Sequence, residues 1–215
     1  MEQGFMDPKI FRERKFLSSW HGPESAFRKV RGGIEASWIP DGLREFYDMS
    51  ASWNVPLEGV RRVFLPHEIS REEGMCMFMM DPGGWAWAFD EELPGAVFEA
   101  KDDGPWRRLS LGWEEFFGFH AFTEAVEAAP IVCWSSGLSA GDLEPFLSMF
   151  RQVQFGGSRW PTGDWRFLAI EEMIGHVGAA PYSDGSFTMK IGVNSDATFD
   201  RLKATSNIEW MFRRR

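Results

Sequence analysis

The chain has 215 residues and a mass of 24.6 kDa, with 44% hydrophobic and 26% charged residues. These values are typical of a soluble globular protein. Aromatic residues make up 15% of the chain, including 11 Trp and 20 Phe, which excludes an intrinsically disordered protein. The two cysteines, Cys76 and Cys133, are too few for a disulfide framework or a cysteine metal site. Both lie in apolar runs, so we expect buried free thiols and a reducing cytoplasm.

The net charge of −9 is concentrated in one segment of the chain. Residues 66–104 hold ten acidic side chains against two basic ones, Arg71 and Lys101, whereas residues 1–65 hold nine acidic and ten basic ones. An acidic surface repels nucleic acid and anionic lipid, because binding to phosphates needs Lys and Arg. It attracts basic proteins by electrostatic steering. Two interpretations stay open: the acids solvate turns and strand edges, or they form a docking patch.

The N-terminal half is predicted to contain short helical pieces followed by a β section. Short apolar pieces at 11–20 and 27–30 precede a helix from Leu43 to Trp53, for which Asp41 is the expected N-cap. Turn signals rich in Pro and Gly then separate four expected strands of an antiparallel meander, at 75–80, 84–89, 96–100 and 106–111. Trp85 and Trp87 alternate with alanines, so we expect both in the core.

The C-terminal half is predicted to mix both kinds of element. Helices are expected at 113–129, at 142–150 and from Asp196 to Leu202, and strands at 131–134, 165–178, 186–193 and 208–212. No apolar run is long enough for a membrane span, and the N-terminus lacks the apolar stretch of a signal peptide. We therefore expect a single α+β domain over 1–215, with a largely antiparallel sheet and helices packed on it.

The segment Gly137-Leu-Ser139-Ala-Gly141 matches the G-x-S-x-G motif of serine hydrolases. In such an enzyme Ser139 would be the nucleophile and His176 the base, with Asp142 or Asp164 orienting the imidazole. However, Ser139 also begins a Ser-x-x-Asp pattern before an apolar run, which is typical of a helix capping box. We favour the capping role and keep the hydrolase as the alternative.

Other chemistry-bearing patterns are weak. The four histidines show no metal-ligand spacing, and no Gly-rich phosphate loop is present. Acidic pairs at strand ends are usually surface turns. The sequence therefore predicts no metal site, no cofactor and no catalytic residue.

Residues 39–129 resemble the SUKH superfamily of small α+β proteins. The similar segments are, in order, IPDGLREFYDMSASW, FLPHEISREEGMCMFMM, GWAWAFDE and AVFEAKDDGPWRRLSLGWEEFFGFHAFTEAV. The order and spacing of these segments carry the resemblance, because no single motif among them is diagnostic. Residues 130–215 would be an α+β extension of that core.

The resemblance implies a non-enzymatic, protein-binding module. Many bacterial members of the superfamily are taken to be immunity proteins, which bind and neutralise a toxin, often a basic nuclease. We therefore expect a protein partner, and neither nucleic acid nor membrane. The expected docking residues are six of the ten acids of the 66–104 segment and one neighbouring tryptophan: Asp81, Asp90, Glu91, Glu92, Asp102, Asp103 and Trp106. A structural or scaffold subunit is a further alternative.

Overall fold

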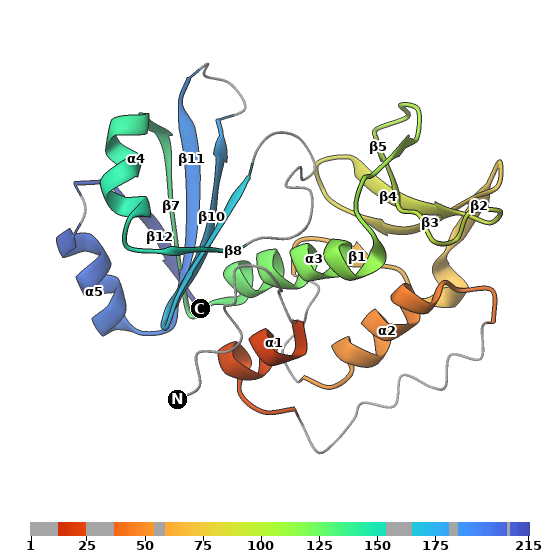
Figure 1. The fold of residues 1–215 in the computed structure, drawn as a ribbon, viewed down its shortest axis with the longest axis horizontal. Helices are drawn as coiled ribbons and strands as arrows, with labels where there is room; N and C mark the ends of the chain where they lie inside the picture. Colours follow the sequence, from red (N-terminus) through yellow and green to blue (C-terminus); the bar gives the residue numbers. More distant parts are fainter. Residues whose placement is uncertain (1–12, 25–36, 54–58, 154–164, 181–184, 206) are drawn as a thin grey trace. The chain divides into compact units, whose positions relative to one another are not determined.

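The computed structural model describes residues 13–24, 37–53, 59–153, 165–180, 185–205 and 207–215 (Figure 1). The chain divides into two compact units, whose boundaries fall inside helices α1 (Glu13–His21) and α3 (Trp113–Ala128). The middle unit is Leu17–Glu124, and the terminal unit is Met1–Phe16 with Ala125–Arg215. The core expected at 39–129 thus overlaps the middle unit, and the extension at 130–215 lies in the terminal unit.

The middle unit is built on an antiparallel sheet in the order β1-β3-β4-β5-β6, with β2 also pairing with β3. The strands are β1 (Arg62–Val63), β2 (Ser70–Glu72), β3 (Met75–Met80), β4 (Trp85–Asp90), β5 (Phe98–Lys101) and β6 (Arg107–Arg108), and a short 3-10 helix, η1, spans Pro66–Glu68. The turn between β3 and β4 places Gly84 at φ +82°, a left-handed conformation that glycine adopts without strain. The residues that alternate between large and small after this turn form β4, close to the strand predicted at 84–89.

Helix α2 (Asp41–Ser50) and the part of α3 up to Glu124 bury most of their apolar residues in the middle unit. Helix α3 is apolar on most sides, which is typical of a helix inside a core. Aromatic rings from β3, β4 and α3 pack together at centroid distances of 5.0 to 6.4 Å: Phe78, Phe89, Trp113, Phe116 and Phe117. Trp87 is fully buried as predicted, whereas Trp85 is only half-buried.

The terminal unit holds a second antiparallel sheet, in the order β12-β7-β11-β10-β9-β8. Its strands are β7 (Ile131–Leu138), β8 (Arg151–Val153), β9 (Arg166–Ile170), β10 (Met173–Ala179), β11 (Phe187–Val193) and β12 (Met211–Arg214). Helices α4 (Ala140–Leu147) and α5 (Asp196–Thr205) lie beside one face of this sheet (Figure 1). Leu143, Phe146, Phe199 and Leu202 of these helices are buried in the apolar core with Cys133.

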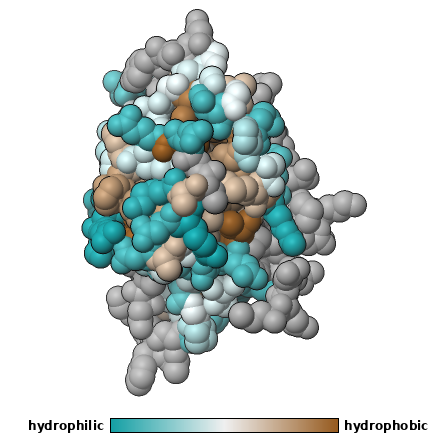
Figure 2. Space-filling view, turned by 90° about the vertical axis from the view of Figure 1, so that its left-hand side faces the viewer, coloured by the Kyte–Doolittle hydropathy of each residue, from teal (hydrophilic) through white to brown (hydrophobic). Residues whose placement is uncertain are grey.

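Figure 2 views the molecule from the side of Figure 1 on which α4 and α5 lie. Hydrophilic surface surrounds separate small hydrophobic patches in this view. Among the described residues of the terminal unit, the exposed large apolar side chains are Met149, Met211 and Phe212. Scattered apolar groups of this kind are normal on a protein surface.

The α+β class and the antiparallel pairing are confirmed. Cys76 and Cys133 are both buried and unpaired, as predicted. Among the described residues, no helix has the length and apolar character needed to cross a bilayer. The short helical segment predicted at 27–30 lies outside the described residues.

Several predicted boundaries are wrong. The strand expected at 165–178 is a hairpin, because the chain turns at Glu171 and Glu172 between β9 and β10. The strand expected at 106–111 shrinks to β6, and the closing strand runs from Met211 instead of 208. Asp41 is not the N-cap of α2: Pro40 holds that position, and the Asp41 carboxylate accepts a hydrogen bond from Arg44 at 2.9 Å instead.

Candidate functional site: an acidic and aromatic face of the middle unit

The predicted acidic residues separate into two groups at opposite ends of β4. Asp81, Asp102 and Asp103 lie at the end where β4 begins. The backbone N–H of Asp102 donates to the carbonyl of Gly84 at 2.7 Å. Oδ1 of Asp81 accepts the backbone N–H groups of Gly83 and Trp85 at 2.8 and 2.9 Å. The carboxylate of Asp81 therefore stabilises its own turn. Trp106, at 36% exposure, follows this group along the chain.

The second group, Asp90, Glu91 and Glu92, lies where β4 ends. Asp90 Oδ1 accepts the backbone N–H of Glu92 at 2.8 Å, which holds the following loop in a turn. A strand of six residues spans roughly 17 Å, so β4 keeps the two groups apart. The predicted docking residues therefore fall into two groups, and the structure brings close together only the members of each group; whether one partner contacts both groups stays a prediction.

An open pocket of about 370 Å³ is lined in part by the loop that follows the second group. Its lining includes Trp38, Pro40, Pro94, Gly95 and Trp113. The indole Nε1–H of Trp113 donates to the carbonyl of Pro94 at 2.8 Å, so the loop after Glu92 is tied to the start of α3. The pocket therefore has aromatic and proline walls, and its lining also holds the ion pair of Arg44 with Asp41.

Arg71 of β2 connects the acidic loop to the aromatic wall. Its guanidinium carbon lies 4.1 Å from the ring centroid of Trp38, and its Nη1 lies 3.3 Å from Oε1 of Glu91. Trp38 and Leu93 are 37% and 43% exposed, respectively. We define the acidic–aromatic face as the following residues of the middle unit: Trp38, Arg71, Glu91, Glu92, Leu93, Pro94 and Trp113.

Sequence reasoning identified Glu91 and Glu92 on this face but missed the other five residues. Trp38 lies more than fifty positions before Glu91, and neither residue carries a pattern that points to the other. The sequence predicts a turn at Pro94-Gly95, but nothing in that pattern indicates that Leu93 before it is exposed.

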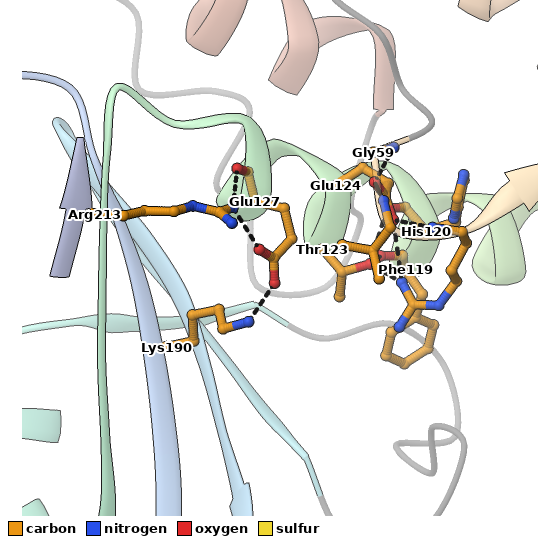
Figure 3. Close-up of polar contacts among 10 residues, drawn as sticks. Gly59, Phe119, His120, Thr123, Glu124, Glu127, Lys190 and Arg213 are labelled. Atoms are coloured by element: carbon orange, nitrogen blue, oxygen red, sulfur yellow. Dashed lines mark hydrogen bonds and ion pairs between the residues drawn. The ribbon is translucent and has the colours of Figure 1, made fainter. Parts of the chain in front are cut away.

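Two buried carboxylates, Glu124 and Glu99, join separate elements of the middle unit, and Figure 3 shows the contacts of Glu124. Glu124 of α3 is fully buried, and its Oε2 accepts the backbone N–H of Val60 at 2.9 Å. Arg61 donates through Nη1 to Thr123 Oγ1 at 2.8 Å and lies 3.5 Å from Glu124 Oε1. Burial raises the pKa of Glu124, and the charge of Arg61 partly opposes this. The arrangement anchors the segment that enters β1.

Glu99 is the second buried carboxylate of this unit. It lies on β5 opposite Trp87 of β4 and Arg107 of β6, and Arg107 forms an ion pair with it. Burial raises the pKa of Glu99, while the hydrogen bond and charge of Arg107 lower it. This pair joins the edge strand β6 to the sheet.

In the terminal unit, Glu127 of α3 takes part in a separate ion-pair group (Figure 3). Its Oε1 lies 2.5 Å from Lys190 Nζ on β11, and its Oε2 lies 3.0 Å from Arg213 Nη2 on β12. These contacts tie two strands to the last turn of the helix and have a structural role.

Ser139 caps α4, as the capping pattern predicts. The Asp142 backbone N–H donates to Ser139 Oγ at 3.2 Å, and the Ser139 backbone N–H donates to Asp142 Oδ2 at 2.9 Å. The Ser139 hydroxyl also donates to Asp142 Oδ2 at 2.6 Å, and these hydrogen bonds lower the pKa of Asp142.

The strand register excludes His176 as a base for Ser139. His176 pairs with Lys190, and Lys190 pairs with Trp134, so Ser139 lies five residues beyond the row that contains His176. Because a bulge in β7 removes one row, the offset is roughly 13 Å along the strands, which is far outside hydrogen-bond reach. Asp164 lies outside the described residues.

In the described part of the chain, no three His, Cys, Asp or Glu side chains come together as a group that could hold a metal ion. Comparisons of the chain with protein-family models, with curated proteins and with solved structures find no match.

Proposed function

We propose that the middle unit is a binding module for a basic protein, and that the chain acts as an immunity protein of the SUKH type. The observation that carries this proposal is the acidic–aromatic face: Arg71 contacts both exposed Trp38 and the carboxylate of Glu91, and exposed Leu93 follows Glu92 at the start of a loop that lines an open pocket.

The chemistry of this face suits protein recognition. Tryptophan is enriched among the residues that contribute most binding energy, because it fills a desolvated pocket with a large rigid ring. Neighbouring carboxylates raise the association rate of a positively charged partner and favour it over acidic competitors. Exposed Leu93, next to Glu92 in the chain, adds apolar area. The face therefore combines anchor and steering groups.

The proposed partner is a basic toxin domain, such as a nuclease. An enzyme that binds phosphates presents Lys and Arg around its active site, and an acidic protein that covers those residues blocks the substrate. The resemblance of residues 39–129 to the SUKH superfamily supports this class of partner. The two buried, unpaired thiols fit action in a reducing cytoplasm.

The test compares two double charge reversals of equal charge change. Glu91→Lys/Glu92→Lys alters the face, whereas Asp48→Lys/Asp103→Lys alters exposed acids of the same unit outside it. Proteins captured from the native host by the wild type are identified, and the association rate of the purified partner is measured from about 50 mM to about 300 mM salt.

We expect a basic partner whose association with the face variant is at least about tenfold slower at low salt. The control variant should stay within about twofold of the wild type. The captured protein, expressed alone, should be toxic, and co-expression of the wild-type chain should restore growth. Equal rates for both variants, or a partner whose binding ignores salt, would refute the proposed face.

A further inference from the structure

Arg71 occupies the acidic–aromatic face in the manner expected of an arginine ligand. Its guanidinium lies over the Trp38 ring at 4.1 Å from the centroid and 3.3 Å from Oε1 of Glu91. A planar guanidinium combines stacking on an aromatic ring with hydrogen bonding to a carboxylate, and an ammonium group cannot stack in this way. Trp38 and Glu91 together therefore form a site shaped for an arginine side chain.

The contacts that hold Arg71 are easily broken. Strand β2 has three exposed residues and pairs with β3 alone. The side chains of Arg71 and Glu91 are 50% and 48% exposed, so water and salt screen their ion pair. Exposed pairs of this kind contribute little to stability. The Arg71 side chain can therefore leave the site without disturbing the sheet.

We propose that Trp38 and Glu91 bind an arginine side chain of the partner, and that Arg71 is an internal competitor that this arginine displaces. The inference rests on the proposed function and names the group that the face recognises. The adjoining pocket between Trp38, Pro94 and Trp113 receives the residue next to that arginine. The charge of Glu91 and Glu92 selects a cation, and the ring of Trp38 selects a guanidinium over an ammonium.

A second arginine in the same unit provides a matched control. The guanidinium carbon of Arg62 lies 5.3 Å from the ring centroid of Phe64, and its Nη2 lies 2.5 Å from Oε1 of Glu68. Arg62 therefore has an aromatic and an acidic neighbour like those of Arg71. Phe64, however, is only 8% exposed and leaves no open ring face for an incoming ligand. Replacing either arginine by alanine changes the net charge equally.

The experiment titrates the full-length chain with two capped peptides, acetyl-Gly-Arg-Arg-Gly-amide and its lysine counterpart, followed by the indole N–H resonance of Trp38. Trp38→Phe identifies that resonance. We expect Arg71→Ala to bind the arginine peptide about five- to tenfold more tightly than the wild type, because the competing state is removed. Arg62→Ala should leave the affinity unchanged, and the lysine peptide should gain much less. Adding Glu91→Gln to Arg71→Ala should cancel the gain.

An Arg71→Ala variant with unchanged or weaker affinity would overturn the inference, and so would an equal gain for the lysine peptide or for Arg62→Ala. Far-UV circular dichroism of each variant verifies its fold. If the Glu91 and Glu92 reversal still slows the natural partner while Arg71→Ala gains nothing, the displacement is wrong and the binding function stands. If neither change has an effect, both proposals fail.

Discussion

The Glu124 carboxylate on α3 accepts a hydrogen bond from the backbone N–H of Val60, at 2.9 Å and across 64 positions of the chain. The same carboxylate also accepts the backbone N–H of Gly59. Buried N–H groups without acceptors are costly, so this one side chain satisfies backbone that would otherwise need water. It also fixes where the chain enters β1.

Replacing Glu124 by alanine should lower the free energy of unfolding by about 3 kcal/mol, because the backbone donors and Arg61 lose their buried partner. Glu124→Gln keeps an acceptor oxygen and should cost less, on the order of 1–2 kcal/mol. Urea denaturation measures both values. Glu114→Gln, an exposed site on the same helix, should stay within about 0.5 kcal/mol. A Glu124→Ala variant as stable as that control would contradict the structural role.

Glu99 predicts a pH dependence of stability. Burial raises its pKa above the ordinary value of 4.5, against the opposing effect of Arg107. A carboxyl with a raised pKa binds its proton more tightly in the folded state, so the free energy of unfolding falls as pH rises from the unfolded pKa through the folded one. Glu99→Gln removes this contribution.

The stability of the wild type relative to Glu99→Gln should therefore decline from about pH 4.5 upward until the folded pKa is passed. Denaturation curves for both proteins across this range provide the measurement, and two parallel pH profiles would show the prediction to be wrong.

Ser139→Ala removes the hydroxyl that accepts the Asp142 backbone N–H, and we expect a loss of about 1 kcal/mol in stability. Ser139→Thr should retain most of it. Ser136→Ala, on the exposed part of β7, is the control and should change stability by less than about 0.5 kcal/mol. Labelling with a fluorophosphonate probe tests the hydrolase alternative in the same variants. Ser139-dependent labelling would favour a nucleophile over a cap.

Gly42→Ala should destabilise the middle unit. A Cβ at this position would lie 2.2 Å from Cβ of Trp113, which is the rigid end of that side chain. Helix α2 or the Trp113 wall of the pocket must then shift, at a cost of about 1–3 kcal/mol. Gly141→Ala in α4 is a matched control, because its Cβ would meet Ser139 Oγ at 3.6 Å, an ordinary contact. Thermal denaturation should show a lower Tm for Gly42→Ala and an unchanged Tm for Gly141→Ala. A Gly42→Ala protein with wild-type Tm would mean that this approach is looser than the geometry indicates.

Elements encoded by neighbouring residues could be predicted. The Asp81-Pro82-Gly83 turn, the apolar runs of β3 and α3 and the Ser139 capping box all depend on residues within a few positions of one another. Such patterns report local backbone preference and which side of an element is apolar. The hairpin at Glu171 and Glu172 was not predicted, because the apolar residues of β9 and β10 have the pattern of one continuous strand.

The amino-acid sequence by itself determined the α+β class, the buried thiols and the concentration of negative charge between residues 66 and 104. Tertiary structure decided where that charge lies, since β4 separates Asp81, Asp102 and Asp103 from Asp90, Glu91 and Glu92. It also decided that Trp38 and Arg71 meet Glu91, a proximity between distant segments that only the pairing of strands and the packing of aromatic rings can create. Local patterns set the elements, whereas the burial of apolar area common to several elements sets which surfaces adjoin.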